Sequence, residues 1–556
     1  MIFKRILFTA FLFLNSFYFS WSQKQTNFWY FGTLCGLDFN SGAPVAQTNG
    51  VLNTNEGCSA MSDANGNLLF YTNGVAVWDK THLQMPNGSG LMGDISSTQS
   101  GLIVPVPGSA NSYYIFTVDY IVGPNGFRYS RVDMSLNGGK GDVTAKNTLL
   151  KNNVVEKQAA VYHCNGTDIW VMVHDWGTNA FYAYLVTGAG INPPVVSNVG
   201  SVYSGNPVDN SVGEMKFSPS GKKIVSAVGY QNIVEVFDFN INTGVVSNPV
   251  QLTFASNHVY GVEFSPDESK LYASYYQIGN AGWLAQFDLN AANVQSTQTL
   301  IGTSFDPNYI YGLQLGSDNK IYAAVEITPW LAVINSPNTA GTSCNYVAQG
   351  VNVDPNSTGS MCMLGLPEFV ASYFNPNFPN LNPTANAGPD VTILAGGSTQ
   401  LNASGGGTYS WSPSAGLSCT TCANPVASPA STTSYEVIVT SASGCTAMDS
   451  VTVFVEPVAP PITCSDPYLP NAFSPNKDGE NDSLKLYYDS SCIVTFSIDI
   501  YDRWGERVFS TSNPAFMWAG DFLKEIMNTQ VFVYRMQATL ADKRIIFKKG
   551  NISLFR

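Results

Sequence analysis

The sequence predicts an all-β protein: a seven-bladed β-propeller, then a small β-sandwich and a third β-domain at the C-terminal end. Three observations support this fold class. Pairs of short apolar strands joined by polar turns recur along the first 374 residues, and two proline-rich segments divide the remaining residues into two further domains. The composition is also typical of β-structure, because 13% of residues are aromatic and only 12% are charged, and aromatic side chains favour strands.

Residues 1–22 have the pattern of a signal peptide. Lys4 and Arg5 give a positive start, residues 6–14 are apolar, and cleavage is expected between Ser22 and Gln23. An uncleaved anchor is the alternative, but the apolar run is shorter than the roughly 20 residues that a membrane span needs. No later segment is predicted to cross a membrane as a helix.

The propeller is predicted over residues 23–374 from an internal repeat. Copies of the strand–turn–strand pattern begin near residues 57, 101, 159, 213, 261 and 312, and this spacing suits a four-stranded blade. Strands at 29–32 and 37–39, joined to a strand at 365–373, are expected to complete a seventh blade. Closure from both ends removes exposed strand edges; six or eight blades are the alternatives.

Two further β-domains follow the propeller. Residues 375–383 form a linker rich in Asn and Pro, and residues 457–462 form a second, proline-rich linker. Between them, residues 384–456 form the small β-sandwich. Its strands are expected at 391–394, 398–401, 408–411, 434–440 and 449–455. Residues 463–556 make up the third domain.

The charge pattern excludes one large class of partners. The net charge is −13, and no run of five or more Lys and Arg occurs. Nucleic acid is therefore not an expected partner, because phosphate binding needs clustered cations. The acidity is most simply explained by solubility.

Ten cysteines behind a signal peptide predict disulfides. Cys464 and Cys492 would close a loop of about 29 residues, worth about 3–4 kcal/mol in the chain-entropy model. Cys344 with Cys362 is a second expected pair. A short structural disulfide is the preferred interpretation of Cys419 and Cys422, over a redox or zinc motif, because no second pair lies at zinc spacing.

The C-terminal domain carries motifs of a known family. These are Tyr-Leu-Pro-Asn-Ala-Phe-Ser-Pro-Asn at 468–476, Asp-Gly-Glu-Asn-Asp at 478–482, Trp-Ala-Gly at 518–520, and the segments 500–509 and 549–556. The domain resembles the type B C-terminal sorting domain of the type IX secretion system, also called the gliding-motility-associated C-terminal domain. Residues 528–531 depart from the usual turn. The resemblance implies a β-sandwich that the secretion machinery recognises and that is then cleaved or attached to the surface.

Weaker resemblances concern the other two domains. Residues 386–390, 409–413 and 435–439 resemble a PKD-like or immunoglobulin-like module, which implies that Trp411 is a core residue. Residues 29–32, 70–74 and 365–368 resemble propeller regions that accompany such modules.

Familiar catalytic motifs are missing from the sequence. The four His lie at no zinc-binding spacing, and neither a Gly-x-Ser-x-Gly elbow nor a phosphate-binding loop occurs. His174-Asp175 could be half of a catalytic pair, but no nucleophile is assigned, and a surface or core position is the preferred interpretation. Glu56, Glu214, Glu263 and Glu368 lie near inner-strand positions and could approach the propeller channel, although solvated acids are the simpler interpretation. No catalytic or cofactor-binding residue is therefore assigned.

One loop of the C-terminal domain concentrates oxygen ligands. Asn476, Asp478, Asn481 and Asp482 surround Gly479, a composition that suits calcium. The spacing is not that of an EF-hand, and hydrogen-bonded Asx turns are the preferred interpretation. No other metal or cofactor is predicted.

These observations predict a non-enzymatic protein that is secreted to the outer cell surface or the medium. Its partners would be the type IX secretion machinery and an unknown surface protein or glycan. The propeller would serve in binding or adhesion to that protein or glycan. One alternative is a glycan- or peptide-degrading enzyme with its site in the propeller channel, which as a glycosidase would need two carboxylates about 5–9 Å apart. Another is an accessory component of the gliding machinery.

Overall fold

The computed structural model describes residues 23–255, 258–304, 308–375, 383–441 and 444–556. The predicted signal peptide, including Ser22 at the expected cleavage site, lies outside these residues. The described chain is built from strands. Its few short helices are η1 (Lys24–Thr26), η2 (Tyr120–Val122), α1 (Pro207–Asn210), η3 (Gly229–Gln231), η4 (Gln295–Thr297), η5 (Gly341–Cys344) and η6 (Ala371–Phe374).

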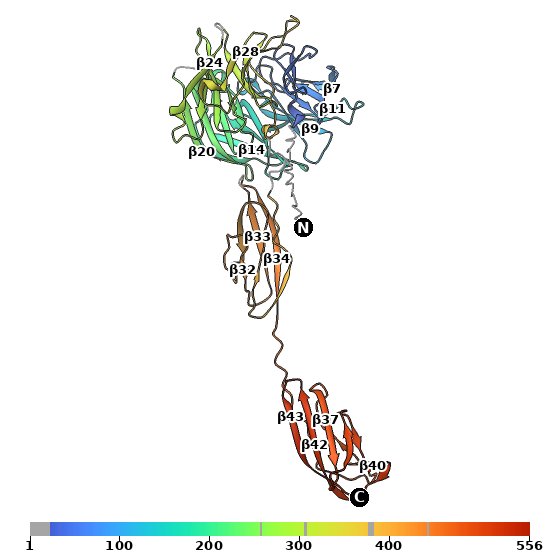
Figure 1. Ribbon diagram of the computed structural model, residues 1–556. Coiled ribbons are helices and arrows are strands. Elements are labelled where there is room, and N and C mark those ends of the chain that lie inside the picture. Colours follow the sequence, from blue (N-terminus) through green and yellow to red (C-terminus); the bar gives the residue numbers. More distant parts are fainter. Residues whose placement is uncertain (1–22, 256–257, 305–307, 376–382, 442–443) are drawn as a thin grey trace, which may run out of the picture. The chain divides into compact units, whose positions relative to one another are not determined.

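Seven antiparallel sheets follow one another along the first part of the chain, coloured from blue to yellow in Figure 1. The first holds β1 (Phe28–Phe31), β2 (Cys35–Asp38) and β3 (Val45–Gln47). The second holds β4 (Ser59–Ser62), β5 (Leu68–Thr72), β6 (Ala76–Asp79) and β7 (Gln84–Ser89). The third holds β8 (Gly101–Pro105), β9 (Ser112–Val118), β10 (Phe127–Asp133) and β11 (Asp142–Lys151).

The remaining four sheets have the same plan. The fourth holds β12 (Val154–Tyr162), β13 (Ile169–Asp175) and β14 (Ala180–Thr187), with β15 (Gly190–Ile191) and β16 (Val195–Asn198) both paired to β14. The fifth holds β17 (Met215–Phe217), β18 (Lys223–Val228), β19 (Ile233–Asn240) and β20 (Val245–Thr253). The sixth holds β21 (His258–Phe264), β22 (Lys270–Tyr276), β23 (Gly282–Asp288) and β24 (Thr299–Thr303). The seventh holds β25 (Ile310–Leu315), β26 (Ile321–Val325), β27 (Trp330–Ile334) and β28 (Tyr346–Asn352).

The inner hairpins form at the turns that the repeat predicts. Between β21 and β22 the backbone N–H of Ser265 donates to the carbonyl of Lys270 (2.9 Å), and the Ser265 hydroxyl donates to Asp267 (2.7 Å). Between β17 and β18 the N–H of Ser218 donates to the carbonyl of Lys223 (2.9 Å), and Gly221 has a φ of +74°. Glycine adopts this left-handed backbone without strain, so local sequence determines these connections.

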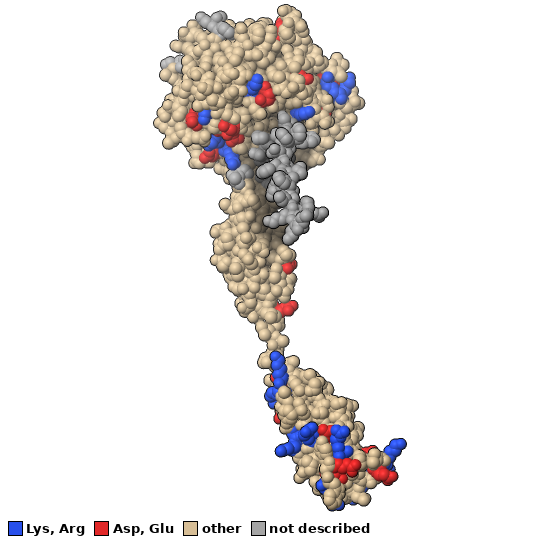
Figure 2. Space-filling view, viewed as in Figure 1, with Lys and Arg blue, Asp and Glu red and all other residues tan. Residues whose placement is uncertain are grey.

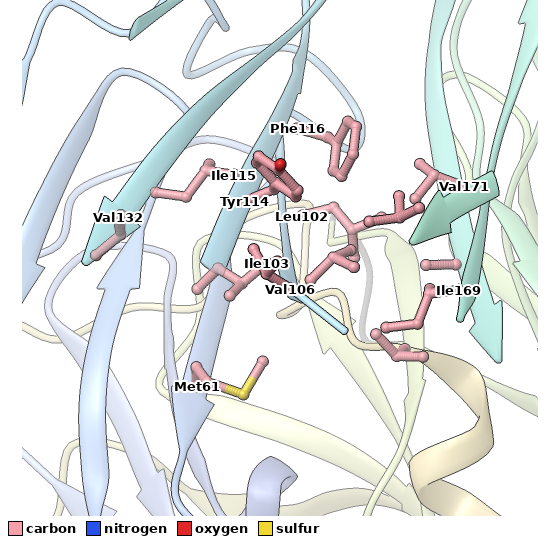
Figure 3. Close-up of a cluster of buried hydrophobic side chains, with 14 of the residues drawn as sticks. Met61, Leu102, Ile103, Val106, Tyr114, Ile115, Phe116, Val132, Ile169 and Val171 are labelled. Atoms are coloured by element: carbon pink, nitrogen blue, oxygen red, sulfur yellow. The ribbon is translucent and has the colours of Figure 1, made fainter. Parts of the chain in front are cut away.

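Apolar clusters between neighbouring sheets form the core. Figure 3 shows one of them, in which Met61 of β4, Leu102 and Ile103 of β8, and Ile169 and Val171 of β13 lie together. The other labelled side chains are Val106, Tyr114, Ile115, Phe116 and Val132. Because successive side chains of a strand point to opposite faces, each sheet contributes to the cluster on either side of it.

The first and last sheets pack on each other. The ring centroids of Trp29 in β1 and Tyr322 in β26 lie 5.5 Å apart, and both side chains are buried in one cluster with Leu331 of β27. Sheets that follow in order and whose ends meet in this way are the arrangement of a β-propeller. The predicted all-β, propeller-type fold is confirmed.

The predicted strand at 365–373 does not form. This segment makes isolated bridges instead, Cys58 with Pro367 and Ala160 with Val370, and it ends in η6. Pro367 has no N–H to donate to a ladder, and the segment contacts the inner strands of more than one sheet. It still joins the two ends of the propeller, because Met361 bridges Thr33 just before it.

The middle domain has the predicted short strands. They are β29 (Val391–Leu394), β30 (Thr399–Gln400), β31 (Thr408–Ser412), β32 (Val426–Ala427), β33 (Thr433–Thr440) and β34 (Thr446–Glu456). Trp411 is buried, as expected for a core residue, and its ring N–H donates to the carbonyl of Cys422 (3.0 Å). The predicted disulfide between Cys419 and Cys422 is present.

The C-terminal domain is built on a five-stranded sheet. Its order is β35 (Ala472–Phe473), β43 (Ile545–Leu554), β42 (Gln530–Leu540), β37 (Ile493–Tyr501) and β38 (Arg507–Thr511), with β35 parallel to β43. Two small pairs accompany it, β36 (Leu484–Lys485) with β39 (Met517–Trp518) and β40 (Asp521–Phe522) with β41 (Glu525–Ile526). The predicted Cys464–Cys492 disulfide is formed, with 5.6 Å between the Cα atoms.

The predicted pairing of Cys344 with Cys362 is wrong. Both residues are buried, but neither is disulfide-bonded in the structure. Cys344 packs between the sixth and seventh sheets, whereas Cys362 belongs to the cluster that joins the seventh sheet to the first. The two thiols therefore lie on opposite faces of the seventh sheet, which their closeness in sequence did not reveal.

Candidate functional site

Three of the four acids singled out in the sequence meet at one buried ammonium. The Nζ atom of Lys216 in β17 lies 3.9 Å from Glu214, 3.8 Å from Glu263 of β21 and 3.4 Å from Glu368. It also donates hydrogen bonds to the carbonyl of Leu313 (2.8 Å) and to the side chain of Gln314 (2.6 Å). We call Lys216 and these three glutamates the channel cluster. The fourth acid, Glu56, does not contact Lys216.

Burial controls the protonation of the channel cluster. Its side chains are 2–6% exposed. Loss of solvation raises the pKa of Glu214 to about 8 and that of Glu263 to about 7, although Lys216 acts in the opposite direction. Burial lowers the pKa of Lys216, but the three carboxyl groups outweigh this effect and the net shift is upward. The lysine therefore stays charged while it is surrounded by carboxyl groups.

The channel cluster has no room for a substrate. The cavity beside it, lined by Lys216, Glu263, Glu368 and Phe369 among others, has a volume of about 20 Å³, enough for about one water molecule. The Glu214 carboxylate accepts backbone N–H groups of Val262 and Leu313 (3.0 and 3.2 Å). The Glu214 carboxylate thus already bonds the backbone of two inner strands. The acids around Lys216 therefore do not form a pocket that could hold a sugar or a peptide.

Sequence reasoning missed Lys216, although a signal was present. The residue just before the last apolar residue of the inner strand is Lys216, Glu263 and Gln314 in three consecutive repeats. Polar side chains at one position of successive buried strands need partners, because lysine and glutamate are almost never fully buried without them. The recurrence at this position therefore indicated that the lysine and the acid could pair across neighbouring sheets.

Glu56 lies in a second buried network near the start of the inner strands. It accepts a hydrogen bond from the hydroxyl of Tyr260 (2.5 Å), and burial raises its pKa to about 8. Nearby, Glu156 accepts hydrogen bonds from the backbone N–H groups of Ile121 (2.8 Å) and Thr98 (3.1 Å) and from the hydroxyl of Ser211 (2.9 Å). These contacts tie together the loops that precede several inner strands.

We expect the melting temperature of the propeller to fall as the pH rises from 5 to 7. The folded-state pKa values of Glu56, Glu214 and Glu263 are about 8, 8 and 7, against about 4.5 in an unfolded chain. Across this range the folded state keeps protons that the unfolded state has released, so stability is lost with rising pH. Burial lowers the pKa values of His174, His82 and His258, which act in the opposite sense, but it also raises those of Glu156 and Glu368. The pKa of Lys157 is lowered to about 7, so this group loses its proton mainly above the range considered.

Thermal unfolding of the purified chain at a series of pH values measures this trend. Glu56→Gln keeps an acceptor for Tyr260 and removes one titrating group, so the slope is expected to become smaller. A melting temperature that stays constant or rises between pH 5 and 7 would contradict the raised pKa values of the buried glutamates.

His174 and Asp175 do not form half of a catalytic pair. The His174 ring is fully buried and stacks on Tyr203 with 3.8 Å between ring centroids. Asp175 instead forms an ion pair with Lys151 (2.7 Å). The histidine is thus a core residue.

An aromatic surface lies at the end of the propeller where the inner strands begin. Tyr230 of η3 and His258 at the start of β21 have ring centroids 3.6 Å apart, and His258 is 5.2 Å from Tyr276 at the end of β22. Tyr276 in turn lies 4.7 Å from Tyr309 and 5.1 Å from Tyr311. We call these five residues the tyrosine cluster. It is assembled from three consecutive sheets, the fifth, sixth and seventh.

The tyrosine cluster is open to solvent at its outer side and supported at its inner side. Tyr230 is 38% exposed, and the nearby loop residues Ile278 and Ile327 are 67% and 59% exposed. Tyr311 is buried and packs edge-on against Tyr260, which holds Glu56. The cluster is thus an aromatic platform with buried rings on one side and solvent on the other.

Carboxylates border the tyrosine cluster. The pKa of Tyr230 is raised by burial and then by Asp209, and that of Tyr276 is raised by burial, with a smaller contribution from Glu326. Glu326 is itself half-buried. Sequence reasoning did not find this site, because its members are separated by up to about eighty positions and only the pairs Tyr275-Tyr276 and Tyr309-x-Tyr311 hinted at it.

The acidic loop of the C-terminal domain is held by its own hydrogen bonds. Asp482 accepts the backbone N–H groups of Lys477 (2.6 Å) and Gly479 (2.9 Å), and Asn476 accepts that of Asp478 (3.1 Å). The contact between Asn476 and Asp478 is that of an Asx turn, as is the one in which Asp478 accepts the N–H of Glu480 (2.8 Å), whereas Asp482 accepts from residues earlier in the loop. Among the residues described, no three or more His, Cys, Asp or Glu side chains are grouped to hold a metal ion. Calcium binding by Asn476, Asp478, Asn481 and Asp482 stays an untested prediction.

One face of the C-terminal sheet carries exposed apolar side chains near its two ends, with the charged pair of neighbours Arg535 and Lys549 between them. Val531 and Val533 of β42 and Ile545 and Phe547 of β43 are 48–69% exposed, while the alternate residues of β42 point into the core. The domain also carries closely spaced charges of both signs (Figure 2), with eleven Lys and Arg and eleven Asp and Glu in residues 463–556. Residues 384–462, by contrast, contain no Lys or Arg.

Comparison with known families identifies the C-terminal domain. Residues 468–554 match the family model of the CHU_C Type IX secretion signal domain. The domain is therefore a type IX secretion signal, and the chain is a secreted or cell-surface protein. No helix in the described residues is long and apolar enough to cross a membrane. No curated protein sequence matches this chain.

Several solved structures are similar to part of this chain at low identity. A protein of unknown function from Desulfotomaculum acetoxidans DSM 771 is 14% identical, with 62% of this chain and 99% of that one covered and a TM-score of 0.37. Hydrazine synthase from Kuenenia stuttgartiensis is 12% identical over 51% of this chain and 76% of that one, with a TM-score of 0.32. TolB from Acinetobacter baumannii is 13% identical over 48% and 56%, with a TM-score of 0.28. These likenesses concern the fold and give this chain no activity.

Proposed function

We propose that this secreted protein is a surface or adhesion protein that binds an extracellular glycan through the tyrosine cluster of its propeller. The observation that carries the proposal is the tyrosine cluster itself. Its side chains lie next to one another at the end of the propeller where the inner strands begin, with the buried rings of Tyr311 and Tyr260 beneath them. The type IX signal brings this platform outside the cell.

The chemistry of the platform suits sugars. A pyranose ring has an apolar C–H face that packs on an aromatic ring, and a rim of hydroxyl groups that need hydrogen-bond partners. Tyrosine offers both a flat apolar body and a polar tip, and Asp209 and Glu326 supply acceptors for hydroxyl donors. Because the supporting rings are already packed, binding would order few side chains.

Substitution of the exposed Tyr230 and the half-buried Tyr309 tests this function. We expect Tyr230→Ala and Tyr309→Ala to weaken binding to glycans on an array by about ten- to thirtyfold each, as for the loss of a central aromatic contact. Leu83→Ala is the matched control, because Leu83 is also exposed (62%) but lies between β6 and β7, at the opposite end of the blades.

Two results would overturn the proposal. One is binding of the wild-type chain to no glycan under conditions where it binds a surface protein, which would make the ligand a protein. The other is glycan binding that survives both tyrosine substitutions in folded variants.

The channel supports a glycan-degrading activity less well. Three carboxyl groups do converge there, but Lys216 occupies the space between them and the remaining cavity is about 20 Å³. No residue of the described propeller points to a role in gliding.

A further inference from the structure

We propose that Cys35 and Cys362 form a disulfide in the exported protein, which links the first sheet to the end of the propeller chain and closes the ring covalently. Cys35 is the first residue of β2 in the first sheet. Cys362 follows the seventh sheet and bridges Thr328, in the connection between β26 and β27.

A short backbone pairing holds the segment of Cys362 against the β1–β2 hairpin that carries Cys35. The N–H of Thr33 donates to the carbonyl of Met361 (2.9 Å), and the N–H of Met361 donates back to the carbonyl of Thr33 (3.0 Å). At Gly32 the approach is so close that an added Cβ would lie 2.5 Å from the Met361 carbonyl oxygen. This antiparallel pairing places Cys362 beside Gly32, and Cys35 comes near the same place because it pairs with Phe31 across the β1–β2 hairpin.

The two thiols are free in the structure and lie in one buried cluster. Cys35 and Cys362 are 1% and 0% exposed and belong to the same apolar cluster, and their side chains are within hydrogen-bonding distance of each other. Little movement is therefore needed to bring the sulfur atoms to bonding distance, and a bond formed there would be shielded from reductants.

The cell compartment favours the bond. The chain carries an export signal, and two cysteine pairs, Cys419–Cys422 and Cys464–Cys492, are disulfides in the structure. Exported proteins meet thiol oxidants outside the cytoplasm. In the proposed step both S–H bonds break and one S–S bond forms. Two electrons and two protons pass to a disulfide-bearing thiol oxidase, whose own S–S bond becomes two thiols.

A third thiol, that of Cys58, lies in the same cluster and is the competing partner. Cys58 bridges Pro367 in the segment that follows Cys362, and its charged neighbours are Glu368 and Lys216. Cys58 and Cys362 are both neighbours of Cys35, but only the side chain of Cys362 is within hydrogen-bonding distance of it. The geometry therefore favours Cys35–Cys362 and leaves Cys58 reduced.

Peptide mapping of the wild-type exported chain tests the bond directly. The full chain is collected from the cell surface or medium, unfolded in guanidinium with N-ethylmaleimide, digested with pepsin at low pH and analysed by mass spectrometry without reduction. We expect one linked pair containing Cys35 and Cys362, which separates on reduction. Maleimide on both residues, or a link from either of them to Cys58, would overturn the proposal.

Thermal unfolding gives a second, independent measurement. The double variant Cys35→Ser/Cys362→Ser is expected to melt roughly 5 °C or more below the wild type in the propeller transition, and dithiothreitol should lower the wild type toward it. Cys344→Ser is the matched control, since Cys344 is equally buried but packs on the other face of the seventh sheet. A double variant that melts with the wild type, or a wild type unaffected by the reductant, would contradict the bond.

Discussion

Removal of residues 463–556 is expected to leave the protein in the periplasm, with the surface and medium fractions reduced to background. The signal peptide predicted at residues 1–22 provides for passage across the inner membrane. The onward step needs the type IX signal, which matches residues 468–554. Because that domain has its own five-stranded sheet and core, its removal should not unfold the propeller.

Cell fractionation with protease treatment of intact cells measures this result. Deletion of residues 384–456 is the matched control, because it removes a domain of similar size and keeps the secretion signal. We expect the control to reach the surface. If the chain without residues 463–556 also reached it, the C-terminal domain would not be the signal that this cell uses, and the localisation would need another explanation.

Lys216→Met is expected to destabilise the propeller by about 3–5 kcal/mol, the usual result of removing one partner from a buried ion pair. The substitution keeps the length of the side chain but leaves Glu214, Glu263 and Glu368 around an apolar group. Urea unfolding should show a lower midpoint, and the loss should be larger at pH 8 than at pH 5, because the carboxyl groups are protonated at the lower pH.

Two comparisons separate the loss of the buried ion pairs from the effect of removing any lysine. Lys223→Met removes a surface pair with Asp238 (3.0 Å, 36% and 46% exposed), so it should cost no more than about 1 kcal/mol. Adding Glu214→Gln, Glu263→Gln and Glu368→Gln to Lys216→Met removes the unpaired carboxyl groups and should recover part of the lost stability. If Lys216→Met cost no more than Lys223→Met, the channel cluster would not be an ion-pair site.

The repeats predicted the inner hairpins because a hairpin depends on residues that are close together in the sequence. Ser265-Pro-Asp and Ser218-Pro-Ser-Gly determine turns by their own side chains and φ angles, and alternating apolar residues determine which face of a strand is buried. The prediction was wrong at residues 365–373, where an apolar run around Pro367 looked like a strand. This segment is buried between the inner strands of different sheets. It therefore makes single bridges to more than one of them instead of a continuous ladder with one strand.

The candidate sites show the same division. The four glutamates were found from their inner-strand positions, but Lys216, the common partner of three of them, was not, and neither was the tyrosine cluster. Each site combines residues from several sheets, and the spacing of Glu214, Glu263 and Glu368 along the chain does not show that they converge on one atom. The failed pairing of Cys344 with Cys362 has the same cause, since sequence separation does not tell on which face of a sheet a residue lies.

The sequence by itself determined that this protein is all-β, that its C-terminal domain is a type IX secretion signal, and that Cys464 can reach Cys492 across a short loop. These features depend on turn residues, on the alternation of apolar and polar residues along a strand, and on motifs within one domain. The tertiary structure alone decided which buried charges meet at Lys216, which tyrosines share a surface and which thiols face each other. Closing the propeller brings together residues as far apart as Cys35 and Cys362, and contacts at such separations depend on how the sheets pack rather than on any local pattern.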